Sequence, residues 1–517
     1  MPQSFRGSNQ KGVQPALSSP STSGRLLAHN TLLTLAGQVI PLVIALSVIP
    51  VLLKGLGTDR FGVLTLSWMV LGYFSLFDLG LGRATTRFVA EALGKNETGS
   101  LPELIWTSFS LHLMLGITTG LILALLTPLL AGRILRISPE MIGDAITTFL
   151  ILSAAIPVIL ASTVLRGVLE ASQRFDLINM VQIPAGSLTF LLPLAGLFIG
   201  FGLPGIVALL MLARLGAAFA YLLLCMKVFP VLRNGYRFDR RVMRPLLSFG
   251  GWITVSNIVG PVLIYLDRFM LGALVSMAAV AYYTAPFEVV TRLMVFPMSL
   301  IMVLFPVFSA AGNLPGEQIA RLYTRSIKYL LLVMGPVLLI MILFAGQILS
   351  LWLGSDVAEK STLAFQILAA GMLLTPVQVS VSLLQGIGRP DISAKFYLLE
   401  LLFYLPMLWF LVRGLGIPGA ALAWTLKALI DTILLFIASG RFYDIGTRVL
   451  SENGLLRGIF ALMTLAVLFS VVHFSGLALR PQIVMAAGAL ILFGLVSWYY
   501  VLDGKDRALL HAGSSGS

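Results

Sequence analysis

Long apolar runs, one after another, constrain this chain more than any other feature of its sequence. About fourteen runs of roughly 20 residues, enough to cross a bilayer as a helix, lie between Leu27 and Leu502. The runs lack the alternation of polar and apolar residues that marks barrel strands, and backbone groups in hydrocarbon must then bond one another within helices. We therefore predict an all-α integral membrane protein with about fourteen transmembrane helices.

The composition supports this prediction. The chain of 517 residues is 58% hydrophobic and only 11% charged, whereas a soluble domain is about 45–50% apolar and about 25% charged. The net charge of +13 would suit nucleic acid in a soluble protein, but here Lys and Arg gather in alternate loops, which marks the cytoplasmic side of a membrane protein. We therefore expect both termini in the cytoplasm and no nucleic-acid partner.

The chain also repeats itself. Gly202-Leu203-Pro204-Gly205 recurs 214 residues later as Gly416-Ile417-Pro418-Gly419, and Leu165-Arg166-Gly167 recurs 219 residues later as Leu384-Gln385-Gly386. An even number of spans in each repeat gives two parallel six-helix bundles, related by an axis along the membrane normal. Two such bundles around a central cavity are the architecture of a transporter that works by alternating access.

The predicted organisation has six parts. They are a disordered cytosolic tail (1–26), an N-terminal six-helix half (27–227), a basic cytoplasmic linker (228–245), a C-terminal six-helix half (246–440), two additional transmembrane helices (455–503) and a second cytosolic tail (504–517). Prolines inside the spans should kink their helices, and they stand at positions 41, 50, 184, 261, 286, 297, 306, 376 and 406. The loops are too short to hold a separate active site, so the function must reside in the spans.

Two motifs resemble a known family. The sequence FDLGLGRA at 77–84, followed by TRFVAE at 86–91, is similar to the signature of Wzx-type polysaccharide flippases, as is KGLGTDRFG at 54–62. That family belongs to a superfamily with the multidrug and toxic compound extruders and the peptidoglycan-precursor flippases. The resemblance extends over essentially the whole chain through its length, its spans and its recurring Gly-x-Pro-Gly.

This resemblance implies a flippase of the bacterial inner membrane. Its substrate would be an undecaprenyl-diphosphate-linked oligosaccharide, moved from the cytoplasmic to the outer leaflet with H⁺ or Na⁺ as a coupling ion. Membrane lipids and other polysaccharide assembly proteins are the further partners it implies. A multidrug or small-metabolite antiporter of the same superfamily is the alternative. We expect no enzyme, catalytic residue, metal or cofactor, because a large outer loop and an acidic catalytic cluster are both missing from the sequence.

Charged residues inside the spans are the candidate site residues. A charge at the bilayer centre costs about 2.5–3.5 kcal/mol, so it normally faces a partner or a watery cavity. Glu288 and Arg292 stand four residues apart, as do Lys427 and Asp431, and each pair shares one helix face. Either each pair neutralises itself in the packing, or Arg292 and Lys427 attract diphosphate while Glu288 and Asp431 hold a coupling ion.

Three further spans carry charges without a partner one turn away. The guanidinium of Arg214 needs an anion from elsewhere, which is either a phosphate or, across helices, Asp267 or Glu400. Glu400 is a candidate proton carrier or one half of an interhelical salt bridge. Asp267, a weaker ion-coupling candidate, and Arg268 are expected near the outer end of their span, within reach of water.

The first family motif contributes three more candidates at the cytoplasmic end of the second span. Arg83 and Arg87 are four residues apart and share a face. They either meet the diphosphate of an entering lipid or anchor the helix among headgroups. Asp78 is a further candidate for ion coupling.

Overall fold

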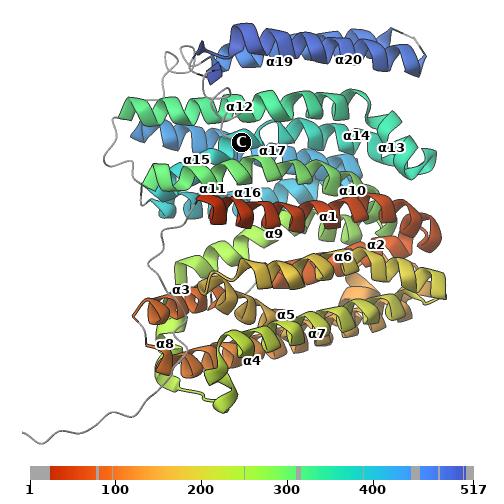
Figure 1. Ribbon diagram of the computed structural model, residues 1–517. Coiled ribbons are helices and arrows are strands. Elements are labelled where there is room, and N and C mark those ends of the chain that lie inside the picture. Colours follow the sequence, from red (N-terminus) through yellow and green to blue (C-terminus); the bar gives the residue numbers. More distant parts are fainter. Residues whose placement is uncertain are drawn as a thin grey trace, which may run out of the picture.

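The structure, a computed structural model, describes residues 24–76, 81–95, 97–249, 251–309, 316–387, 389–443, 454–475, 478–504 and 506–507. Within these ranges every regular element is a helix. Ten helices there are long and apolar enough to cross a membrane, or eleven if one bent pair counts as a single span. The prediction of an all-α protein with many membrane-spanning helices is confirmed at this level. Most of the helices run nearly side by side (Figure 1).

The helices of the N-terminal part pack mainly on one another, with α5 against α3, α4 and α7, and α1 against α6. Small residues let the backbones of α4 and α5 come close, as is common in membrane bundles. A Cβ on Gly116 would lie 2.5 Å from Pro157 Cα, and one on Gly120 would lie 2.5 Å from the Ser153 carbonyl oxygen. These elements are α1 (Gly24–Leu56), α2 (Thr58–Leu76), α3 (Leu81–Gly94), α4 (Leu101–Leu129), α5 (Ile142–Ala171), α6 (Phe175–Ile199) and α7 (Leu203–Val228).

A second set of helices follows α8, which packs on α3 and α4. In this set α17 packs on α14 and α16, and α10 packs on α9 and α14. Helix α8 spans Arg240–Phe249. The second set consists of α9 (Gly251–Leu274), α10 (Met277–Thr291), α11 (Val295–Ser309), α12 (Gly316–Leu343), α13 (Ala345–Leu353), α14 (Ser355–Met372), α15 (Val379–Gly386), α16 (Pro390–Leu415) and α17 (Ile417–Phe442). Short 3₁₀ turns, η5 (Arg292–Met294) and η7 (Thr375–Gln378), follow α10 and α14.

The repeated motifs occupy equivalent places in the two sets. Gly202 precedes α7 and Gly416 precedes α17, and each helix has its proline in the first turn, where a missing N–H costs no hydrogen bond. Leu165-Arg166-Gly167 lies near the end of α5, and Leu384-Gln385-Gly386 ends α15. The predicted proline kink is present at Pro376, which lies in η7 where α14 and the segment after it are bent by 42°.

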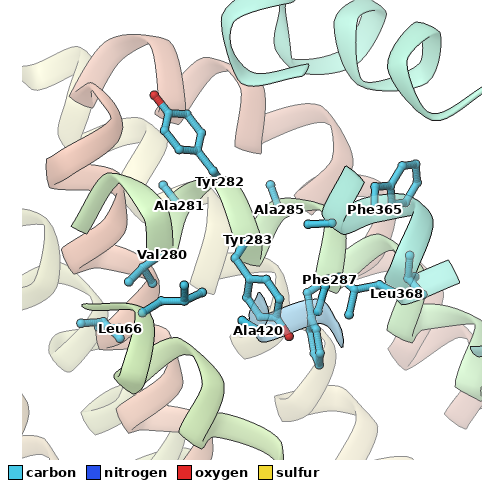
Figure 2. Close-up of a cluster of buried hydrophobic side chains, with 14 of the residues drawn as sticks. Leu66, Val280, Ala281, Tyr282, Tyr283, Ala285, Phe287, Phe365, Leu368 and Ala420 are labelled. Atoms are coloured by element: carbon cyan, nitrogen blue, oxygen red, sulfur yellow. The ribbon is translucent and has the colours of Figure 1, made fainter. Parts of the chain in front are cut away.

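One apolar core joins α2 to the second set of helices. Figure 2 shows Leu66 of α2 beside Val280 of α10, while Tyr283 and Phe287 extend toward Ala420 of α17. Contacts between α1 and α13 and between α2 and α9 add to this junction.

The last two helices, α19 (Leu455–Phe474) and α20 (Leu479–Val496), form a pair that lies along α12 (Figure 1). Phe344 packs edge-on against Phe469 at this contact. Beyond α20, the Asp506 carboxylate accepts a hydrogen bond from Lys328 of α12 at 2.5 Å. The pair is therefore held to α12 by both apolar packing and a buried charge pair.

Candidate functional site: a charged cavity

A cavity of about 560 Å³ opens among α9, α10, α16 and α17, beside η5 and η7. Its walls combine aromatic rings with charges of both signs, which is typical of sites that hold polar ligands in an apolar surrounding. The polar and aromatic lining comprises Tyr265, Arg268, Phe287, Glu288, Thr291, Arg292, Thr375, Gln378, Tyr397, Trp424, Lys427 and Asp431.

Glu288 stands between two arginines of this cavity. Its Oε2 accepts a hydrogen bond from Arg292 Nη2 at 3.0 Å, and its Oε1 lies 3.5 Å from Arg268 Nη2. The first contact is the one predicted from the spacing of four residues. The second joins α10 to α9, and hydropathy along the chain carried no signal for it.

Asp267 and Arg268 are buried, so the expectation that they reach water near a span end is wrong. Asp267 is 0% exposed and Arg268 2%, because α10 and α16 both pack against α9. Tyr283 donates a hydrogen bond to Asp267 Oδ2 at 2.5 Å, and the Arg268 guanidinium lies 4.2 Å from the centre of the Phe287 ring. A buried charge is stable only with such partners.

Lys427 pairs across helices rather than along its own. Its Nζ lies 3.5 Å from Glu400 Oε2, so the interhelical salt bridge, one of the two alternatives for Glu400, is present. Lys427 thus has its ion-pair partner on α16, whereas one of the two alternatives for Lys427 and Asp431 was an ion pair along α17. Asp431 instead accepts a hydrogen bond from Gln378 of η7. The physical reason is that α16 and η7 both pack on α17, so that each of its two charged side chains finds a partner on a neighbouring element, Glu400 for Lys427 and Gln378 for Asp431.

A smaller cavity of about 150 Å³ lies between the two sets of helices. Elements α1, α2, α6, α10 and α13 contribute to its walls, and its aromatic lining comprises Phe61, Trp68, Phe190 and Trp352. Glu288 and Arg292 line this cavity as well as the larger one. This ion pair therefore stands where the charged cavity meets the junction between the two sets.

The remaining predicted residues lie elsewhere. Arg214 Nη2 is 3.4 Å from Thr189 Oγ1 in the smaller cavity's wall, and its predicted partners Asp267 and Glu400 are engaged with other residues. Arg83 and Arg87 are exposed on α3. The structure thus brings together Asp267, Glu288, Arg292, Glu400, Lys427 and Asp431, and it leaves the other cationic candidates apart. Asp78 lies outside the described residues.

Several cavity residues are not among those predicted from the sequence. Gln378 is a polar residue two positions after a span proline, which is a signal that could have been used, because a helix break frees polar groups. Tyr265, Tyr397 and Trp424 carried no such signal. In the part of the chain that the structure describes, no three His, Cys, Asp or Glu residues gather as a metal site would need.

These features define a multi-pass membrane protein in which buried charges face an internal cavity. The chain belongs to the family described as polysaccharide biosynthesis protein, which matches residues 27–311. The predicted resemblance to Wzx-type flippases is thereby confirmed.

Named relatives agree with this family. A protein of Shigella flexneri named as a candidate O-antigen transporter is 28% identical over 413 residues, which cover 79% of this chain and 96% of that one. The lipopolysaccharide biosynthesis protein WzxC of Escherichia coli is 24% identical over 395 residues, covering 75% of each chain.

Solved structures share the fold at lower identity. The lipid II flippase MurJ in an inward closed conformation gives a TM-score of 0.70 at 12% identity and covers 93% of this chain and 100% of that one. An inward-facing multidrug resistance transporter of the MATE family, in the MOP superfamily, gives 0.69 at 18% identity and covers 79% of this chain and 98% of that one. At these identities the likeness concerns the fold.

Proposed function

We propose that this protein is a flippase that moves a lipid-linked oligosaccharide across a membrane by alternating access. The observation that carries the proposal is the position of the Glu288–Arg292 pair, which lines both the charged cavity and the cavity between the two sets of helices. A ligand held there touches both sets, so a change in their relative position would change its exposure. Family membership and the named relatives give independent support.

The finer proposal concerns the substrate and its site. Arg292, Lys427 and Arg268 would attract the diphosphate of an undecaprenyl-diphosphate-linked sugar, because guanidinium forks suit phosphate oxygens. Glu400 and Asp431, each close to the cationic groups, are the proposed positions for a coupling H⁺ or Na⁺, with Asp267 and Glu288 as further candidates. Arg214, Arg83 and Arg87 would attract the same anionic group before or after it occupies the cavity.

The proposed arrangement in the membrane has about fourteen spans. Two halves, 27–227 and 246–440, would move against each other, with the pair within 455–503 attached to the second. Both termini would face the cytoplasm of a bacterium, since that orientation places most loop Lys and Arg inside.

Contacts at one end of the bundle fit a closed outer side in this orientation. The backbone N–H of Ala278 donates to Asp59 Oδ1 at 3.1 Å, and Trp352 Nε1 donates to the Leu46 carbonyl at 2.7 Å. Both bonds join the first set of helices to the second. Opening this end would require both to break.

The deciding experiment measures where the lipid-linked sugar accumulates. Loss of the gene should leave it on the cytoplasmic leaflet, as detected by leaflet-specific labelling of extracted and intact membranes. Reintroduced wild-type protein should restore export, whereas Arg292→Ala should be present in the membrane and fail to restore it. Normal leaflet distribution together with increased drug sensitivity would instead favour the multidrug antiporter, which the fold also accommodates.

A further inference from the structure

We propose that Glu288 is a resident counterion which an incoming diphosphate displaces from the two arginines of the cavity. This inference rests on the proposed function and adds a step to it. In the empty site Glu288 holds Arg268 and Arg292 together, and in the loaded site the diphosphate takes its place.

Glu288 bridges the guanidinium groups of two arginines. Each oxygen of Glu288 contacts a different arginine, at 3.5 Å for Arg268 and 3.0 Å for Arg292. Both arginines also line the cavity. A diphosphate presents two anionic groups and can engage two guanidinium forks at once. The carboxylate therefore occupies the position that best suits the ligand.

Arg268 has partners other than Glu288 that hold its side chain in place. Arg268 is fixed between the rings of Phe287, at 4.2 Å, and Tyr265, at 5.4 Å, and its Nη1 is 4.0 Å from Asp267. Arg292 is less constrained, since 40% of its side chain is exposed. Displacing Glu288 would thus leave one rigid and one adjustable cation for the ligand.

Charges of both signs lie close together in and around the cavity. Three cations, Arg268, Arg292 and Lys427, meet four carboxylates in and around the cavity, which are Asp267, Glu288, Glu400 and Asp431. Asp267, Glu400 and Asp431 are nearly fully buried and held by partners from neighbouring helices. Glu288 is 38% exposed. It is the carboxylate that can move away when a second anion enters, because like charges repel strongly where water is scarce.

The displaced side chain has a place to go. Glu288 also lines the smaller cavity, whose opposite walls belong to α1, α2 and α6. Ligand binding on the α9 and α17 side would therefore send a negative charge toward the first set of helices. When the ligand leaves, Glu288 returns to the arginines and opposes rebinding, so it favours release.

The test compares binding with transport in the purified full-length chain. Farnesyl diphosphate serves as the probe, and farnesol, which lacks the anion, as the control ligand. Glu288→Gln keeps the side-chain shape and removes the charge, so it should bind farnesyl diphosphate roughly tenfold more tightly than the wild type. Its transport of lipid-linked sugar in vesicles should be slower, because release is impaired. Farnesol binding should be unchanged.

A matched control is Glu317→Gln, which removes the carboxylate of another Arg–Glu pair four residues apart, 3.3 Å from Arg321 near the start of α12, where both side chains are exposed. It should bind and transport as the wild type does. Equal or weaker binding of farnesyl diphosphate by Glu288→Gln would overturn the inference and make Glu288 a group that orients Arg292. Glu288→Ser provides a second variant should the Gln variant fold poorly. Failure of the wild type itself to bind the probe would overturn the proposed diphosphate site, and the inference with it.

Discussion

Gly62 of α2 lies directly against the backbone of Met277 in α10, so that a Cβ at residue 62 would come within 2.0 Å of the Met277 carbonyl oxygen. One turn earlier, Asp59 accepts a hydrogen bond from the N–H of Ala278, near the start of α10. A carboxylate is favourable at a helix N-terminus, where backbone N–H groups lack partners. The two sets of helices thus meet at a contact that requires glycine on one side.

Gly62→Ala should keep this end of the bundle from closing. The added methyl meets backbone, which cannot rotate away, so α2 and α10 must separate. We expect transport to fall at least about tenfold at normal protein levels, since about 1.4 kcal/mol of bias changes a population tenfold. The measurement is vesicle transport together with the labelling rate of a cysteine placed at Thr58 in a Cys225→Ser background.

The control for this prediction is Gly216→Ala in α7, where a new Cβ would meet nothing within 4 Å. It should leave transport and labelling unchanged. Equal labelling rates in Gly62→Ala and the wild type would show that the contact does not hold this end closed.

Lys427→Met should abolish transport and also lower stability, because Glu400 would be left buried at 1% exposure without its cation. Adding Glu400→Gln should restore stability by removing that charge. If Lys427 attracts the substrate or Glu400 holds the coupling ion, the double variant stays inactive. Recovery of transport in the double variant would show that Lys427 serves only to neutralise Glu400 and that Glu400 does not hold the coupling ion. Thermal unfolding and vesicle transport, measured side by side, separate the effect on stability from the effect on transport.

Arg214→Ala and Arg292→Ala should reduce transport to different extents, although both arginines are predicted from the sequence as candidates for binding the diphosphate. Arg292 lines both cavities, whereas Arg214 Nη2 lies 3.4 Å from Thr189 Oγ1. A charge-assisted contact to the ligand is worth about 1.5–3 kcal/mol, so losing Arg292 should reduce transport by roughly ten- to a hundredfold. We expect a smaller loss for Arg214→Ala. Similar losses in both would place Arg214 on the substrate path.

Lys328→Met should release the α19 and α20 pair from α12. Lys328 and Asp506 have fully buried side chains 2.5 Å apart, and breaking a buried pair costs about 3–5 kcal/mol. Adding Asp506→Asn should recover part of the loss. The exposed pair Lys95–Glu91, at 2.7 Å, is the control, since Lys95→Met should cost about 0–1 kcal/mol. Thermal unfolding in detergent measures the stability of the two single variants and the double variant. Equal losses of stability in Lys328→Met and Lys95→Met would contradict the prediction.

The same pair predicts acid sensitivity. Burial raises the pKa of Asp506, but hydrogen bonds from Lys328 and Tyr329 outweigh it, and the pKa is lowered overall. Because the pKa of Asp506 is lower in the folded than in the unfolded protein, the ionised carboxylate stabilises the fold at pH values above the unfolded pKa of about 3.9. This contribution is lost as the pH falls through the folded pKa. The acid-induced loss of stability should therefore be smaller in Asp506→Asn. If the stability of Asp506→Asn depended on pH as that of the wild type does, other carboxylates would account for the acid sensitivity.

Local features of this protein were determined by the sequence itself. The length and apolarity of the runs require membrane-spanning helices, Gly-x-Pro-Gly starts α7 and α17 because its proline suits a first turn, and Glu288 pairs with Arg292 because four residues make one turn. Each of these depends on neighbours along the chain. The sequence therefore contained all the information that they needed.

The tertiary structure decided everything that depends on which helix faces which. Glu400 meets Lys427, and Arg268 meets Glu288, across helices. In helices apolar on nearly all sides, hydropathy does not say which face is buried against protein and which against lipid, so it does not give the partners of a buried charge. Asp267 lies at the centre of the packing rather than near water for this reason. The site exists because helix packing brings these charges together.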